Sequence, residues 1–194
     1  GGTLLELLAT HPKLTVWWVV FTADGKRKAE ATASARSFLK GAGKSKIIVK
    51  QFRNGFFPHE GARIKEFFEQ LKRQVQPDAV FTHERNDRHQ DHRVISDLTW
   101  NTFRNHLILE YKIPKYDGGL GSPNFFVPVS ETSCREKTQR LIEFFGTQRD
   151  KHWFSEDLFL GLMRLRGIES ASPTRYAEAF HCRKMVWSEK TSSY

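Results

Sequence analysis

Short apolar runs alternate with helix-forming segments through the first half of this sequence, and this alternation most constrains the fold. Apolar runs typical of buried strands lie at 14–22, 47–49 and 79–82. Segments with the spacing or composition of helices lie at 3–9, 29–39, 64–75 and 91–105. Strands and helices in strict alternation predict an α/β fold, a Rossmann-like three-layer α/β/α arrangement with a mostly parallel sheet.

The second half of the chain has a looser pattern. Residues 114–128 are rich in Pro and Gly and predict a long surface loop that ends in a strand at 125–127. Helices are expected from about 135 to 145 and from about 156 to 166, with a closing strand near 177–181. Because no internal repeat or linker divides the sequence, a single domain over residues 1–194 is predicted.

Composition limits the class of protein. With 39% apolar residues and 16 Phe, the chain can bury a core and is globular. Its 31 Lys+Arg against 22 Asp+Glu give a net charge of +9, which suggests an anionic partner. No recognition motif accompanies the charge, so a solvated basic face is a better interpretation than nucleic-acid binding.

The cysteines and the length of the apolar runs bear on the cellular compartment of the protein. The two cysteines, Cys134 and Cys182, are far apart, which argues against a zinc ribbon or a disulfide framework and predicts a cytoplasmic protein. The longest apolar run, 16–21, is too short to form a transmembrane segment.

The segment 86–92, Asn-Asp-Arg-His-Gln-Asp-His, holds the strongest chemical signal. Two histidines and two carboxylates follow the strand predicted at 79–82, and ligands of open α/β sheets bind outside the carboxyl ends of strands. Hydrolytic metal chemistry needs these groups: neutral His binds zinc, a carboxylate orients the ring, and a second His carries a proton or a charge. A polar loop that is merely rich in His is the alternative, but the position at a strand end favours the metal site.

Two other segments resemble known binding motifs, but their neighbouring residues do not fit those motifs. Residues 41–45, Gly-Ala-Gly-Lys-Ser, resemble the end of a phosphate-binding P-loop, but Phe38 stands where that motif needs Gly. A helix also precedes them where the P-loop needs a strand. His11-Pro12-Lys13 begins like a His-Pro-Asp-Asp metal motif but carries no carboxylate, so it predicts a turn.

With these residues in place, the chain resembles the LmbE/PIG-L-like family of zinc-dependent de-N-acetylases along nearly its whole length. The segments that carry the resemblance are Gly1-Gly2-Thr3-Leu4, residues 22–25 with Arg27 and Glu30, Phe52-Arg53-Asn54-Gly55, residues 77–92, Ser122-Pro123-Asn124-Phe125, Gln148 and residues 176–180. The last of these, Tyr-Ala-Glu-Ala-Phe, is fairly specific. The resemblance implies a Zn²⁺-dependent hydrolase that removes an acetyl group from an N-acetylglucosamine-type sugar.

The resemblance also implies roles for the residues of 86–92. His92 would be a zinc ligand, and His89 would face the reacting carbonyl and stabilise its oxyanion. Asp91 would orient a histidine, and Asp87 would be a second carboxylate near the site without a defined role.

Arg27 and Asn54 would lie near the sugar, although the family usually carries Asp where Asn54 stands. The implied partner is an N-acetylated sugar or glycoconjugate. The sequence leaves the oligomeric state open, a homo-oligomer included.

One part of the family pattern is missing from this sequence. The His-Pro-Asp-Asp segment that supplies two zinc ligands and the general base precedes the Gly-Gly at which this sequence begins. Because catalytic zinc normally needs three protein ligands, the sequence predicts an N-terminally truncated chain that is inactive as given. The alternative is a non-catalytic sugar- or polyanion-binding protein on the same fold, which would explain the net charge of +9.

Overall fold

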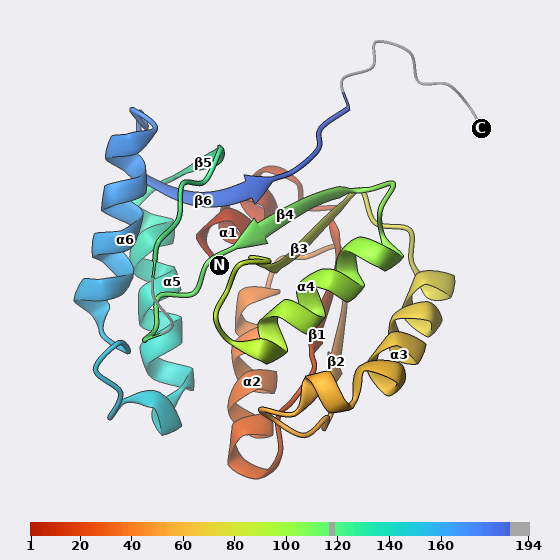
Figure 1. The fold of residues 1–194 in the computed structure, drawn as a ribbon. Helices are drawn as coiled ribbons and strands as arrows, with labels where there is room; N and C mark the ends of the chain where they lie inside the picture. Colours follow the sequence, from red (N-terminus) through yellow and green to blue (C-terminus); the bar gives the residue numbers. More distant parts are fainter. Residues whose placement is uncertain (117–118, 187–194) are drawn as a thin grey trace. The chain divides into compact units, whose positions relative to one another are not determined.

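The computed structural model describes residues 1–116 and 119–186 (Figure 1). Its helices are α1 (Gly2–Thr10), α2 (Gly25–Phe38), α3 (Gly61–Gln74), α4 (Gln90–Thr102), α5 (Glu131–Phe144) and α6 (Glu156–Glu169), with short 3₁₀ turns η1 (Phe57–His59) and η2 (Gly146–Gln148). Its strands are β1 (Thr15–Val20), β2 (Lys44–Val49), β3 (Ala79–His83), β4 (Leu107–Tyr111), β5 (Phe125–Val129) and β6 (Tyr176–Cys182).

The α/β class predicted from the sequence is confirmed. β1 pairs in parallel with β2, from Thr15 opposite Lys44 to Val20 opposite Val49. β3 pairs in parallel with β4, and β6 runs antiparallel to β4. Within the described residues the strands form two sheets, β1-β2 and β3-β4-β6-β5, where the sequence predicted one.

The chain divides into two compact units. Unit 1 comprises Gly1–Phe57 and Phe126–Ala179, and unit 2 comprises Pro58–Phe125 and Phe180–Tyr194. The single domain expected over residues 1–194 therefore stays a prediction.

In unit 1, helices cover the β1-β2 sheet and one another. α2 packs against β2 and α5, and α5 also packs against α1 and α6. Buried Val129, Cys134 and Met163 form a core cluster of this unit. α5 begins earlier than predicted because the Ser130 hydroxyl accepts a hydrogen bond from the Ser133 N–H and caps the helix.

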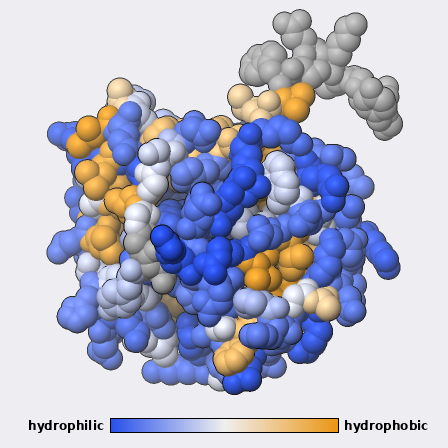
Figure 2. Space-filling model, viewed as in Figure 1, coloured by the Kyte–Doolittle hydropathy of each residue, from blue (hydrophilic) through white to orange (hydrophobic). Residues whose placement is uncertain are grey.

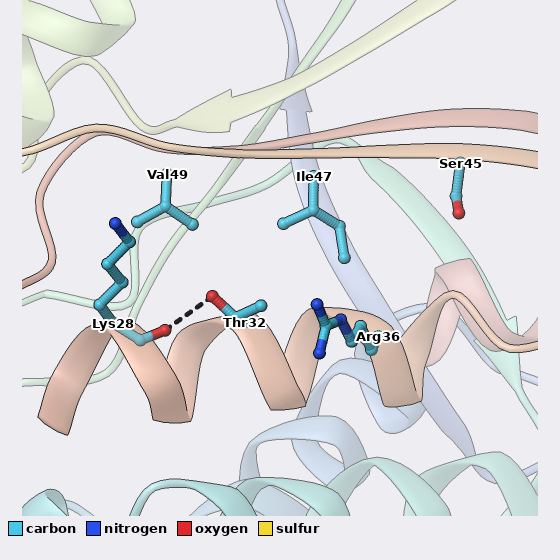
Figure 3. A pocket seen from close by; sticks show the side chains of 6 residues that line it. All are labelled: Lys28, Thr32, Arg36, Ser45, Ile47 and Val49. Atoms are coloured by element: carbon cyan, nitrogen blue, oxygen red, sulfur yellow. Dashed lines mark hydrogen bonds between the residues drawn. The ribbon is translucent and has the colours of Figure 1, made fainter.

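A groove also lies in unit 1, between α2 and β2 (Figure 3). We call it the α2–β2 groove and define it by its lining residues, Lys28, Thr32, Arg36, Ser45, Ile47 and Val49.

In unit 2, α3 buries one apolar stripe, made by Ile64, Phe67, Phe68 and Leu71. This i, i+3, i+4, i+7 spacing is the amphipathic pattern that predicted the helix. α4 packs against β3 and α3. Strand β4 was not predicted. The helix before it was expected to reach residue 105, and the apolar run that follows this helix was too short to distinguish from a loop.

The face of the molecule drawn in Figure 2 is largely hydrophilic, with small hydrophobic patches. Over residues 1–116 and 119–186, no helix is both long and apolar enough to cross a membrane. Cys134 and Cys182 are both free thiols, Cys134 buried and Cys182 partly exposed.

Candidate active site

The segment between β3 and α4 is folded by its own polar groups. β3 ends at His83 and α4 begins at Gln90, so the predicted site segment lies at the carboxyl end of a parallel strand. The Glu84 carboxylate accepts a hydrogen bond from the Asn86 N–H (2.9 Å), and the Glu84 carbonyl accepts one from the Asp87 N–H (3.2 Å). These bonds turn the chain tightly and bring Asp87 back toward the strand end.

Three imidazole rings gather at this turn. The ring of His92 stacks on that of His83, with centroids 4.0 Å apart and planes 4° apart. It also stacks on the ring of His89, with centroids 4.5 Å apart and planes 23° apart. Tyr111 of β4 closes the cluster, with its ring centroid 5.0 Å from that of His83.

The Asp87 carboxylate contacts two of these histidines, His92 and His89. Its Oδ2 lies 3.1 Å from Nδ1 of His92, and its Oδ1 accepts a hydrogen bond from the His89 N–H (2.9 Å). Asp87 is only 3% exposed. Burial acts to raise the pKa of Asp87, but the His89 N–H and the neighbouring His92 outweigh it and lower that pKa below its ordinary value.

His89 caps helix α4. Its Nδ1 accepts a hydrogen bond from the Asp91 N–H at 3.3 Å. A ring nitrogen that accepts carries no proton, so in neutral His89 the proton sits on Nε2. The ring therefore presents an N–H donor on its other side.

Burial keeps the other two imidazoles neutral. It lowers the pKa of His83 well below the ordinary value, and a proton on the neighbouring His92 would lower it further. Burial also lowers the pKa of His92, although the Asp87 carboxylate opposes this change. Both rings are thus uncharged at neutral pH, the state in which an imidazole nitrogen can bind a metal. Burial raises the pKa of Tyr111 to about 12, so its hydroxyl stays protonated.

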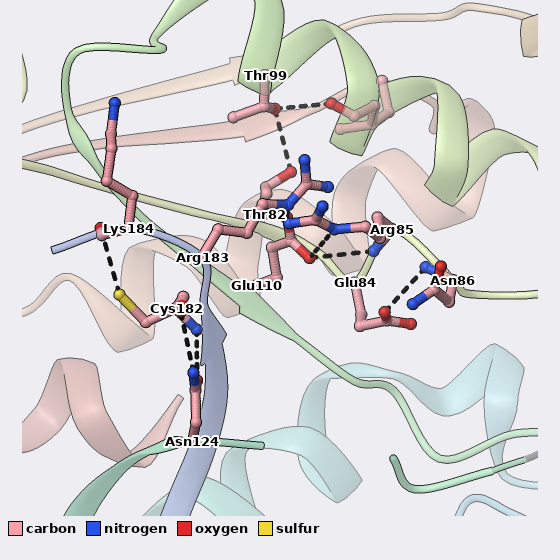
Figure 4. A network of polar contacts seen from close by, with 11 residues as sticks. Thr82, Glu84, Arg85, Asn86, Thr99, Glu110, Asn124, Cys182, Arg183 and Lys184 are labelled. Atoms are coloured by element: carbon pink, nitrogen blue, oxygen red, sulfur yellow. Dashed lines mark hydrogen bonds and ion pairs between the residues drawn. The ribbon is translucent and has the colours of Figure 1, made fainter. Parts of the chain in front are cut away.

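An ion-pair network around the buried Glu110 carboxylate of β4 supports the turn (Figure 4). Glu110 is 1% exposed, its Oε1 lies 2.8 Å from Nε of Arg183, and its Oε2 accepts a hydrogen bond from the Arg85 N–H at 3.2 Å. Burial raises the pKa of Glu110, and the hydrogen bonds and charge of Arg85 oppose the rise. Arg85 is thereby held at the base of the turn that carries the histidines.

The zinc site expected from the resemblance is not complete in these residues. His92 has the arrangement of a metal-binding histidine, because a carboxylate faces its Nδ1 and leaves Nε2 for a metal. However, no group of three His, Cys, Asp or Glu side chains that could hold a metal ion exists within residues 1–116 and 119–186. The described residues fit one ligand of a three-ligand site and do not fit a whole one.

The structure brings some of the predicted site residues together. His89, Asp91 and His92 all lie at the start of α4 in unit 2. Arg27 is exposed in the first turn of α2, and Asn54 is exposed in the turn after β2; both belong to unit 1. The roles of all five stay predictions.

Two members of the cluster were missed by sequence reasoning, His83 and Tyr111. Each ends a strand of unit 2, and the two face each other because β3 and β4 pair in register. His83 follows directly on the strand predicted at 79–82, and this position was the signal that could have identified it.

A protein-family model matches part of the chain. It is the PIG-L model, which describes GlcNAc-PI de-N-acetylase, and it matches residues 9–103. This range includes the three histidines and Asp87. No protein with a curated description matches the chain.

Solved structures with the same fold extend the match to nearly the whole chain. The conserved protein TT1542 from Thermus thermophilus has a TM-score of 0.70 and 17% identity, covering 100% of this chain and 91% of that one. The N,N'-diacetylchitobiose deacetylase from Pyrococcus horikoshii has a TM-score of 0.61 and 20% identity, covering 93% and 76%. A zinc-inhibited form of teicoplanin deacetylase Orf2 has a TM-score of 0.68 and 13% identity, covering 94% and 91%.

Proposed function

Because the PIG-L family model matches residues 9–103, we propose that the protein removes an acetyl group from an N-acetylated sugar. The reaction is amide hydrolysis, which releases acetate and leaves a free amine on the sugar. An N-acetylglucosamine-type substrate agrees with the family description and with the activity for which the Pyrococcus horikoshii deacetylase is named.

The single observation that carries this proposal is the hydrogen bond at the start of α4. Because Nδ1 of His89 accepts the Asp91 N–H, the donor on Nε2 is available to a substrate. Attack on an acetamide carbonyl places negative charge on its oxygen, and a fixed N–H donor stabilises that charge. We assign this donor role to His89.

Asp87 and His92 serve the same centre. The Asp87 carboxylate holds the backbone of His89 through one oxygen and faces the ring of His92 through the other. It thus fixes both imidazoles relative to the start of α4, since all three residues lie on one short turn. In this proposal Asp91 supports His89 through its backbone N–H.

Zinc belongs to the proposal as the cofactor, with His92 as one of its ligands. A carboxylate facing the other ring nitrogen is a common partner of zinc-bound histidine. Because the described residues provide only part of a zinc site, we derive no step through the metal.

Arg27 and Asn54 are proposed to contact the sugar. Both side chains are exposed, and a guanidinium and an amide together offer donors and an acceptor to sugar hydroxyls. Asn can replace Asp as an acceptor in such a contact, but it brings no charge.

The test is acetate release from N,N'-diacetylchitobiose by the protein expressed from its complete reading frame. We expect His89→Ala to lower kcat/KM by roughly 10²–10³, the usual cost of one lost oxyanion donor. His152→Ala is the matched control, because His152 is exposed and lies in unit 1. Wild-type acetate release by His89→Ala would refute the assigned role.

The second candidate is a non-catalytic sugar- or polyanion-binding protein on the same fold. The net charge of +9 favours it. The two candidates separate in the same assay: a binder retains the sugar without releasing acetate.

A further inference from the structure

The α2–β2 groove has a polar wall where an apolar one is expected. A helix that packs on a strand normally turns its apolar stripe toward it. Here α2 lines the groove with three residues spaced four apart, and therefore on one face of the helix: Lys28, Thr32 and Arg36. β2 lines it with alternate residues of one face: Ser45, Ile47 and Val49. Figure 3 shows the two sets pointing toward one another.

The two cations of this groove are not neutralised by the protein. Lys28 and Arg36 are exposed, and no carboxylate among residues 1–116 and 119–186 forms an ion pair with either. Glu30, which lies between them on α2, is engaged elsewhere, since its Oε1 accepts a hydrogen bond from the Thr147 N–H (2.9 Å).

Much of the net positive charge of the chain lies in the segment that carries α2 and β2, although Lys44 and Lys46 lie on the face of β2 opposite the groove. Between residues 24 and 50, the sequence has eight Lys and Arg and two Asp and Glu, a net charge of +6 out of the total of +9. These residues include all of α2 and β2. A surface with charge of one sign attracts ligands of the opposite sign.

A solvated basic face is the simpler explanation, and the shape of the groove argues against it. On such a face the aliphatic parts of Lys28 and Arg36 would lie flat on Ile47 and Val49 and fill the space above them. Instead a shallow, solvent-open groove with a volume of about 430 Å³ remains between the two sets of side chains. Small-molecule sites are usually clefts of about 300–1,000 Å³.

We propose that the α2–β2 groove binds an elongated small ligand that carries two oxyanion groups, phosphates or sulfates. Eight helical positions separate Lys28 from Arg36, about 12 Å along the axis, so each cation binds one group. Ammonium and guanidinium groups form charge-assisted hydrogen bonds with such oxygens.

The middle of the groove suits the middle of such a ligand. The Thr32 hydroxyl donates to the Lys28 carbonyl at 2.7 Å, so its oxygen still accepts a hydrogen bond from the ligand. The Ser45 hydroxyl offers a donor opposite, and Ile47 and Val49 contact apolar carbon atoms. None of the groove's lining residues has a role in the proposed deacetylation, although Arg27, a proposed sugar contact, also lies on α2.

The test is isothermal titration of the wild-type chain with fructose 1,6-bisphosphate, with fructose 6-phosphate as the single-phosphate comparison. Lys28→Ala/Arg36→Ala removes both groove cations from exposed positions, and circular dichroism checks its fold. Lys72→Ala/Arg73→Ala is the control, because it removes the same two charges from the last turn of α3, outside the groove. Phosphatidylcholine vesicles with and without phosphatidylserine test whether the oxyanion comes from a lipid headgroup.

We expect the bisphosphate to bind more tightly than the monophosphate. Lys28→Ala/Arg36→Ala should weaken its binding about tenfold or more, while the control double variant stays within about twofold of wild type. Vesicle binding that is lost together with bisphosphate binding in the groove variant would support the site and point to a lipid source. No bisphosphate binding by wild type, equal weakening in both double variants, or binding to vesicles alone overturns the proposal. No acetylated sugar is present, so the outcome does not depend on the proposed enzyme activity.

Discussion

The imidazole of His83 lies parallel to that of His92, with ring centroids 4.0 Å apart and planes 4° apart. Nδ1 of His83 is buried, and within the described part of the chain it has no hydrogen-bond partner. Nδ1 of His92 is likewise buried without a hydrogen bond of good geometry among the described residues, but it has the Asp87 carboxylate 3.1 Å away. Substitutions of His83 can therefore separate the contribution of ring packing to the free energy of unfolding from that of hydrogen bonding.

Replacement of His83 by Phe should be tolerated. Phe keeps a flat ring against His92 and Tyr111 and removes a buried polar atom without a partner, so we expect the free energy of unfolding to stay within about 1 kcal/mol of wild type. His83→Ala leaves a cavity and should cost roughly 2–3 kcal/mol. Urea unfolding of the two variants measures both values. Equal losses would mean that the ring nitrogens, rather than the ring itself, hold the cluster.

Replacement of Asp87 by Asn should lower activity more than stability. The amide keeps the shape of the side chain but puts a neutral group beside Nδ1 of His92 and removes the charge that the His89 N–H stabilises. Loss of a carboxylate that orients a metal-binding histidine typically costs about 10–100-fold in activity, and we expect that range for acetate release. Asp97→Asn makes the same chemical change at an exposed position of α4 and should release acetate at the wild-type rate.

Because of Glu178, we expect the free energy of unfolding to decrease as the pH becomes acidic. Its carboxylate accepts hydrogen bonds from the N–H groups of Gly2 and Thr3, both at 2.8 Å, and lies 2.8 Å from Nζ of Lys137. Burial acts to raise the pKa of Glu178, but Lys137 and the hydrogen bonds hold it well below the ordinary value of 4.5. Since the folded pKa lies below the unfolded one, the stabilisation is complete above the unfolded value and is lost as pH falls toward the folded one.

We expect Glu178→Gln to cost roughly 3 kcal/mol at pH 7, because it leaves the ammonium of Lys137 without its partner. The difference from wild type should shrink below about pH 4.5. Glu131→Gln breaks an exposed pair with Arg135 and should change stability by less than about 1 kcal/mol. Urea unfolding from pH 7 to pH 3 tests both, and a difference for Glu178→Gln that does not change with pH would contradict the ion pair.

Local sequence patterns predicted most of the helices and strands, because each such element is determined by residues that lie close together in the chain. The stripe of Ile64, Phe67, Phe68 and Leu71 is complete within one helix, and the apolar run of β1 is complete within one strand. β4 differs from both because Glu110 interrupts its apolar residues. The sequence does not show that Arg85 and Arg183, distant along the chain, lie beside that carboxylate and make its burial tolerable.

The candidate site was predictable in its chemistry and less so in its geometry. Two histidines and two carboxylates in 86–92 indicated the site, because residue type and strand position suffice for that. Which carboxylate faces His92 depends on how the chain turns at Glu84, and that turn rests on hydrogen bonds that no pattern encodes. The position of Tyr111 depends on the register of β4 beside β3 in the same way.

Two glycines of α6 should respond in opposite directions to the same substitution. A Cβ atom on Gly167 would lie 2.1 Å from the Arg175 carbonyl oxygen and 2.8 Å from the Tyr176 Cα, so Gly167→Ala forces backbone apart. We expect it to cost about 3 kcal/mol or more in unfolding free energy. Gly161 has no such neighbour within 4 Å, and Gly161→Ala should stabilise the helix by roughly 0.5–1 kcal/mol. Urea unfolding followed by circular dichroism measures both, and similar values for the two variants would contradict the close approach of α6 to the start of β6.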